Sequence, residues 1–193
     1  MIVNILKTLP WYLVGAAILG IPAMLLIGAL FAPLDCEGFI FGSCWAADIF
    51  MDLDGVLEDG QDPTMATADF NLMFAWLNVN LLILTVIFSL GWSIGSHFLN
   101  INEPGRAKFF GFYWLIVSGA CVGGIILVCF IVLDFSSSFT ASQDITISSQ
   151  TNLIILSTLY YGLMYWISVI LGTARQARSA VLLANKLPAR NFL

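Results

Sequence analysis

The sequence is poor in charged residues, and basic residues are the scarcer kind. Asp, Glu, Lys and Arg make up 10% of the chain, whereas soluble domains carry about 25%. Hydrophobic residues reach 60%, and the mean hydropathy is +0.94. The low charge excludes an ordinary soluble domain, and the lack of a basic stripe excludes a nucleic-acid-binding surface. We therefore expect an integral membrane protein.

Histidine and recognisable catalytic motifs are equally scarce. His97 is the only histidine, which excludes a bis-histidine haem site within one chain. A single neutral imidazole is a suitable ligand for a bound pigment or haem, so His97 stays a candidate of that kind. No residues have the spacing of a metal site, a phosphate-binding loop or a Ser-His-Asp set. We predict no enzyme activity, no catalytic residues and no evident cofactor, with bound lipid or pigment left open.

Long apolar runs predict spanning helices, which need about 20 consecutive apolar residues each. We expect one all-α membrane domain over residues 1–193, with a C-terminal tail at 173–193 and four spans at about 10–32, 70–98, 109–133 and 152–172. Asn102-Glu103-Pro104-Gly105 is a turn signal. The second and third spans should therefore form an antiparallel hairpin.

Local signals refine the ends of these spans. Asp62-Pro63-Thr64 is expected to break the chain before the second span, and Asp69 to cap the helix that follows. Trp11 and Tyr12 suit the membrane interface. The last helix is expected to continue past the membrane until Pro188 stops it.

Basic and acidic residues are sorted to opposite ends of the spans. All seven basic residues fall before the first span, between the second and third, or after the fourth. Eleven of the twelve acidic residues fall in the other two loops or at their edges. Under the positive-inside rule, both termini are expected in the cytoplasm and the acidic loops outside. The expected location is the cell (inner or plasma) membrane, as a multi-pass protein.

The first outer loop carries an amphipathic pattern over residues 43–60, with a helix expected at about 44–59. At about 100° per residue, its apolar side chains share one arc and its acids the opposite one. The acidic face is interpreted as solvated or as a docking surface for a basic partner. Asp52, Asp54 and Glu58 are a weak calcium candidate, because the spacing of an EF-hand loop fails.

Two cysteines, Cys36 and Cys44, share that loop. An outer loop faces an oxidising space, so we predict a disulfide bond between them. A redox-active pair is the alternative. Such pairs usually have the C-x-x-C form, which this sequence lacks.

Small and polar residues recur at helical spacing on the predicted spans. They indicate helix packing, in which each hydroxyl or amide group contributes about 0.6 to 2 kcal/mol. The predicted packing residues are Ala16, Gly20, Ala23, Asn78, Thr85, Ser89, Ser96, Gly119, Gly123, Ser157, Tyr161 and Tyr165. The stripe on the second span could instead line a polar path, although no Lys, Arg, Asp or Glu lies near the centre of a span.

Three functional hypotheses follow from these observations. The first is a non-catalytic structural or accessory subunit of a larger membrane protein complex, because the packing stripes exceed what one four-helix core needs. The second is a small channel or transporter (permease) subunit with a polar path along the second span. The third is a thiol-redox membrane protein. The expected partners are the lipid bilayer and other integral membrane subunits or copies of the chain, with no nucleic acid.

Overall fold

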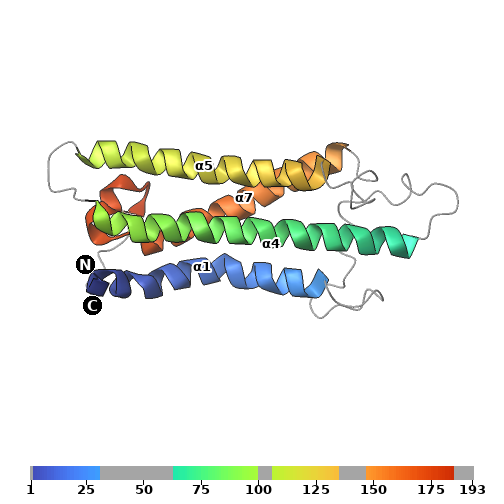
Figure 1. Cartoon of the computed structure of the whole chain (residues 1–193), viewed down its shortest axis with the longest axis horizontal. Helices are drawn as coiled ribbons and strands as arrows, with labels where there is room; N and C mark the ends of the chain where they lie inside the picture. The colour runs from blue at the N-terminus through green and yellow to red at the C-terminus, as the bar shows by residue number, and fades with distance from the viewer. Residues whose placement is uncertain (1, 31–62, 100–105, 135–146, 185–193) are drawn as a thin grey trace. The chain divides into compact units, whose positions relative to one another are not determined.

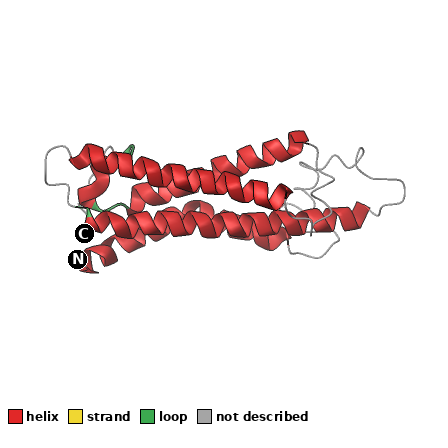
Figure 2. Cartoon of the chain, turned by 45° about the horizontal axis from the view of Figure 1, so that its top comes forward, coloured by secondary structure: helices red, strands yellow, loops and turns green. Residues whose placement is uncertain are grey.

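The structure is a computed structural model that describes residues 2–30, 63–99, 106–134 and 147–184. Every regular element within these ranges is a helix (Figure 2). In chain order they are α1 (Ile2–Leu30), α4 (Pro63–Gly95), η1 (Ser96–Phe98), α5 (Arg106–Asp134), α7 (Ile147–Gly172) and η2 (Arg175–Ala180), and Figure 1 labels the four long ones.

The four long helices contain segments long and apolar enough to cross a membrane. These segments are Ile2–Leu25, Leu72–Phe98, Lys108–Leu133 and Gln150–Gly172. Within the described residues they confirm the predicted all-helical fold with four helices long and apolar enough to span a membrane. In lipid, a helix satisfies its backbone polar groups internally, and this explains why each apolar run takes this form.

The starts of two helices differ from the predicted ones. The first span starts at Ile2, and Pro10 lies inside α1. A proline in a membrane helix costs one backbone hydrogen bond and is tolerated there, so the apolar turns before it remain helical. Helix α4 starts at Pro63, which suits the first helical position because that N–H has no intrahelical partner. Asp69 consequently lies within α4 and does not cap it.

The end of the last span also differs from the prediction. Helix α7 ends at Gly172 and does not continue to Pro188. The backbone of Ala174 is extended, with ψ of 144°, and its N–H donates a hydrogen bond of 2.9 Å to Ser96 Oγ. The chain then continues as the short 3₁₀ helix η2. The turn is therefore stabilised by a tertiary hydrogen bond to Ser96. No local sequence signal predicts this bond.

The chain divides into two compact units. Unit 1 comprises Met1–Gly20, Ile83–Gly124 and Tyr160–Leu193, and unit 2 comprises Ile21–Leu82 and Ile125–Leu159. Helices α1 and α5 begin in unit 1, whereas α4 and α7 end in it. Successive helices therefore traverse unit 1 in alternating directions, as hairpin connections require.

Unit 2 has an apolar core. Its fully buried side chains include Phe70, Met73, Leu77 and Ile125, each 0% exposed. The rings of Phe70 and Phe74 stack one helical turn apart, with centroids 6.1 Å apart. Asn78 lies at the edge of this core, and its side-chain amide donates a 2.7 Å hydrogen bond to the carbonyl of Phe74.

Several predicted features fall outside the described residues. They are the amphipathic helix at 43–60, the cysteine pair Cys36 and Cys44, and the calcium candidate Asp52, Asp54 and Glu58. These features stay predictions.

Candidate functional site

The polar stripe predicted on the second span lies in the interior of unit 1. Thr85, Ser89 and Ser96 are each 0% exposed, and Ser93 beside them is 4% exposed. Three- and four-residue spacing places these hydroxyls on one face of α4. Two of these hydroxyls, those of Ser89 and Ser93, contact α1 and α7.

Helix α1 contacts this face through Tyr12. The Tyr12 hydroxyl lies 3.1 Å from Ser89 Oγ and donates a 3.2 Å hydrogen bond to the carbonyl of Val86. Tyr12 is 3% exposed, so its ring packs inside unit 1. Its position relative to the membrane interface stays a prediction.

Helix α7 contacts the same face around Gly172. The Ser93 hydroxyl donates a 2.7 Å hydrogen bond to the Gly172 carbonyl. The indole N–H of Trp92 donates to Thr173 Oγ1 at 3.1 Å. A Cβ on Gly172 would lie 2.8 Å from Ser93 Oγ and 3.0 Å from Tyr12 Cβ. Helices α1, α4 and α7 therefore meet at a position where any side chain is too large.

A second close approach joins α1 to α7. A Cβ on Gly15 would lie 2.9 Å from the backbone Cα of Ser168. Farther along α1, the Tyr160 hydroxyl donates a 2.6 Å hydrogen bond to the Leu19 carbonyl. We name the contacts around Gly15 and Gly172 the glycine junction.

The small-residue stripe predicted on α1 matches this surface in part. Gly20 and Ala23 are buried and Ala16 is half-buried, but the closest helix contact is made by Gly15, which the predicted stripe missed. At about 100° per residue, Gly15 lies about 140° around the helix from Gly20 and therefore off the predicted stripe. No spacing along α1 would have identified it.

Helix α5 contacts α7 on one side and leaves its predicted glycine pair on the other. The Ser118 hydroxyl lies 3.2 Å from the Tyr165 hydroxyl. Gly119 and Gly123, in contrast, are exposed. A Cβ on either one would meet no described atom within 4 Å beyond its own helix backbone and chain neighbours. This glycine pair therefore lies on the outward face of α5.

The remaining predicted packing residues are buried. Tyr161 and Tyr165 on α7 are 1% and 2% exposed, and Ser157 is 8% exposed. Their four-residue spacing places them on one side of α7.

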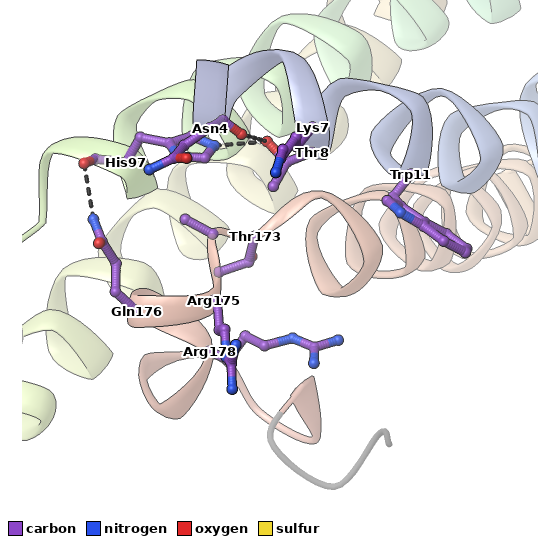
Figure 3. Close-up of a pocket in the computed structure, with 10 residues that line it drawn as sticks. Asn4, Lys7, Thr8, Trp11, His97, Thr173, Arg175, Gln176 and Arg178 are labelled. Atoms are coloured by element: carbon purple, nitrogen blue, oxygen red, sulfur yellow. Dashed lines mark hydrogen bonds between the residues drawn. The ribbon is translucent and has the colours of Figure 1, made fainter. Parts of the chain in front are cut away.

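A polar cavity of about 630 Å³ lies at the end of unit 1 where α1 begins and α7 ends (Figure 3). Its lining includes Lys7 and Thr8 of α1, His97 of η1, and Arg175 and Arg178 of η2. Asn4, Trp11, Thr173, Ala174 and Gln176 complete the lining. The cavity brings together side chains that are separated by most of the sequence.

His97, the candidate cofactor ligand, lies in the wall of this cavity. Its Nε2 atom is 2.6 Å from Thr8 Oγ1, and its carbonyl accepts a 2.8 Å hydrogen bond from Gln176 Nε2 (Figure 3). The Thr8 hydroxyl is also 3.0 Å from the Ile5 carbonyl. If Thr8 donates to that carbonyl, His97 Nε2 carries the hydrogen that Thr8 accepts. Nε2 is therefore committed to a contact between helices.

The part of the chain that the structure describes contains no cluster of metal-binding side chains. Within these ranges no three His, Cys, Asp or Glu side chains are grouped to hold a metal ion. Cys121 and Cys129 are buried and not disulfide-bonded.

Comparison with known proteins adds no assignment. No family model, no curated protein and no solved structure matches this chain. Function must therefore be argued from the residues and their contacts.

Proposed function

We propose that this protein is a non-catalytic accessory subunit of a larger membrane protein complex, and that α5 supplies its main contact with another subunit. The outward glycine pair carries the proposal. Small residues four apart let two helix backbones approach closely in lipid, where packing and not hydrophobic transfer drives association. Gly119 and Gly123 have this spacing, face away from their own chain and have open space above them.

The burial of the spans supports the choice of α5. In its most apolar stretch, 17% of the residues of α5 are buried within the chain, against 22% for α1 and 44% for α4 and α7. Around the glycine pair, α5 exposes large apolar side chains, including Phe112 at 61% and Ile116 at 52%. Such side chains beside a shallow glycine surface provide ridges that flank the close approach of a second helix.

The proposal assigns the polar stripe of α4 to packing within the subunit. A conduction path needs hydroxyls that water can reach, and Thr85, Ser89 and Ser96 are fully buried. Ser89 also contacts Tyr12 of α1, and Ser96 accepts a hydrogen bond from Ala174 in the turn before η2. We therefore favour the accessory role over the channel or transporter hypothesis.

The proposal also places both termini in the cytoplasm, in the cell membrane. The described residues of unit 1 include Lys7, Arg106, Lys108, Arg175 and Arg178 but no Asp or Glu. Basic residues close to span ends are retained on the cytoplasmic side during insertion. The acidic first loop would then lie outside, where it can meet a basic surface of the partner.

Extraction from native membranes in a gentle detergent, followed by size-exclusion chromatography and identification of co-purifying proteins, tests this function. The informative variant is Gly123→Ile, because a branched side chain would hold two helices apart. Gly91→Ile on α4 is a matched control. Gly91 is also exposed and helical, and a Cβ there would meet no described atom within 4 Å beyond its own helix backbone and chain neighbours.

We expect the wild type and Gly91→Ile to elute with partner subunits and Gly123→Ile to elute as the free chain. A wild type that is a stable monomer contradicts the proposal. Equal behaviour of the two variants contradicts the role of α5.

A further inference from the structure

We propose that the cavity lined by Lys7, Arg175 and Arg178 binds the phosphate of an anionic phospholipid head group. The inference is independent of the accessory role, because it concerns a different end and surface of the helices. The cavity volume of about 630 Å³ lies within the range of about 300 to 1,000 Å³ typical of small-molecule sites. It is large enough for a head group and not only for a single ion.

The charge of the cavity selects an anion. Three of its lining residues are Lys or Arg, and the described residues of unit 1 contain no carboxylate to neutralise them. Guanidinium groups bind phosphate oxygens in a bidentate manner, and a lysine ammonium adds a compact point charge. A phosphate would therefore supply the negative charge that the described residues of unit 1 lack.

The geometry of η2 places the two arginines on the same side of this short helix. Residues three apart eclipse one another in a 3₁₀ helix, because it has three residues per turn. Arg175 and Arg178 have this spacing in η2 and both line the cavity (Figure 3). An α-helix at this position would rotate the two side chains apart by about 60°.

Hydrogen bonds hold the walls in place around this cation cluster. Ala174, just before η2, donates to Ser96 Oγ, and Gln176 within η2 donates to the His97 carbonyl. His97 is linked in turn to Thr8, the neighbour of Lys7. The three basic residues are thus carried by backbone segments that are tied to one another before any ligand binds, which reduces the entropic cost of binding.

The position of the cavity favours a lipid over a free anion. The spanning segments of α4 and α7 end at Phe98 and Gly172, directly beside the lining residues. Trp11 in the wall is a residue type typical of the head-group layer. Farther along α1, Leu13 and Val14 are 55% and 50% exposed, so acyl chains can lie against them. Lys7, which lies within the α1 span, reaches the polar layer through its flexible stem.

Titration of the full-length, detergent-purified protein with defined lipids, read by native mass spectrometry, tests the site. The probes are dioleoyl phosphatidylglycerol and dioleoyl phosphatidylcholine, which have the same acyl chains and different net charge. We expect the anionic lipid to bind more tightly. Arg178→Gln should weaken its binding about fivefold, the equivalent of about 1 kcal/mol for each basic residue near a membrane surface.

Lys108→Gln is the matched control, because Lys108 is an exposed cation of unit 1 that does not line the cavity. Lys108→Gln should change the affinity for the anionic lipid by less than about twofold, since Lys108 contributes only a screened surface charge. Lys7→Gln is a second cavity variant and should reproduce the loss if Arg178→Gln fails to fold.

Three results would overturn the proposal. The first is equal binding of the two lipids by the wild type. The second is an equal loss in the cavity variants and in Lys108→Gln, which would mean general surface charge. The third is full displacement of the anionic lipid by millimolar inorganic phosphate, which would identify a site for a free anion. Tighter binding of the anionic lipid, lost selectively in the cavity variants and resistant to phosphate, supports it.

Discussion

Two glycine surfaces of unit 1 have opposite surroundings. At the glycine junction, Gly15 and Gly172 are buried, and a Cβ on either would lie 3.0 Å or less from an atom of another helix. On the outward face of α5, Gly119 and Gly123 are exposed and have open space above them. The comparison teaches that a glycine in a membrane helix is informative only when its neighbours are known. The first surface packs within the chain, and the second is not covered by any described residue.

The largest expected effect is a loss of stability at the buried glycine junction. Gly15→Ala should destabilise the protein by about 1 to 3 kcal/mol, the usual cost of overpacking. The reason is that the new methyl group would meet the backbone of α7, 2.9 Å from Ser168 Cα and 3.2 Å from the Ile167 carbonyl oxygen. Backbone atoms move only if the whole helix shifts.

Unfolding of the purified protein in a denaturing-detergent titration measures this loss. Gly162→Ala on α7 is a suitable control, because Gly162 has no described neighbour within 4 Å of the added Cβ. A Gly15→Ala protein as stable as the wild type would mean that α1 and α7 do not approach as closely as described.

The second largest loss of stability is expected when Ser96, which accepts a hydrogen bond beside the glycine junction, is replaced. Ser96→Ala should cost about 1 kcal/mol, because the buried N–H of Ala174 then loses its acceptor. Limited proteolysis provides a second measurement. The turn between Gly172 and η2 should be cut faster in the variant, since that hydrogen bond closes the turn. An unchanged cleavage rate would show that the turn does not depend on Ser96.

The smallest expected effect is a gain of stability on the outward face of α5. Gly123→Ala should stabilise the isolated chain by about 0.5 kcal/mol, because alanine reduces the backbone freedom of the unfolded state and meets no neighbour here. The same denaturing-detergent titration detects it. Destabilisation instead would indicate that Gly123 is packed against something in the purified chain.

The helices themselves were predictable from sequence. Apolar runs of sufficient length and the period of the polar residues on α4 depend on local chemistry, which each segment carries by itself. Helix ends were less predictable. The start of α1 at Ile2 depends on how lipid tolerates Pro10, and the end of α7 depends on the contact between Ala174 and Ser96.

The sites were predictable only as residue types. The polar residues predicted on α4 and α7 are buried in the structure, but Gly15 and the burial of Tyr12 were not predicted. The cavity was not foreseen either. Lys7, His97 and Arg178 lie in three distant parts of the chain, and no spacing along the sequence links them.

The helical fold and the four helices able to cross a membrane could be predicted from the sequence, because hydropathy and helical period are properties of each segment alone. Only the tertiary structure decided which glycines face inward, which hydroxyls bond to a neighbouring helix and which cations share a cavity. These features depend on the rotation of each helix about its axis. That rotation is set by packing against other helices, so it emerges only when the helices are assembled.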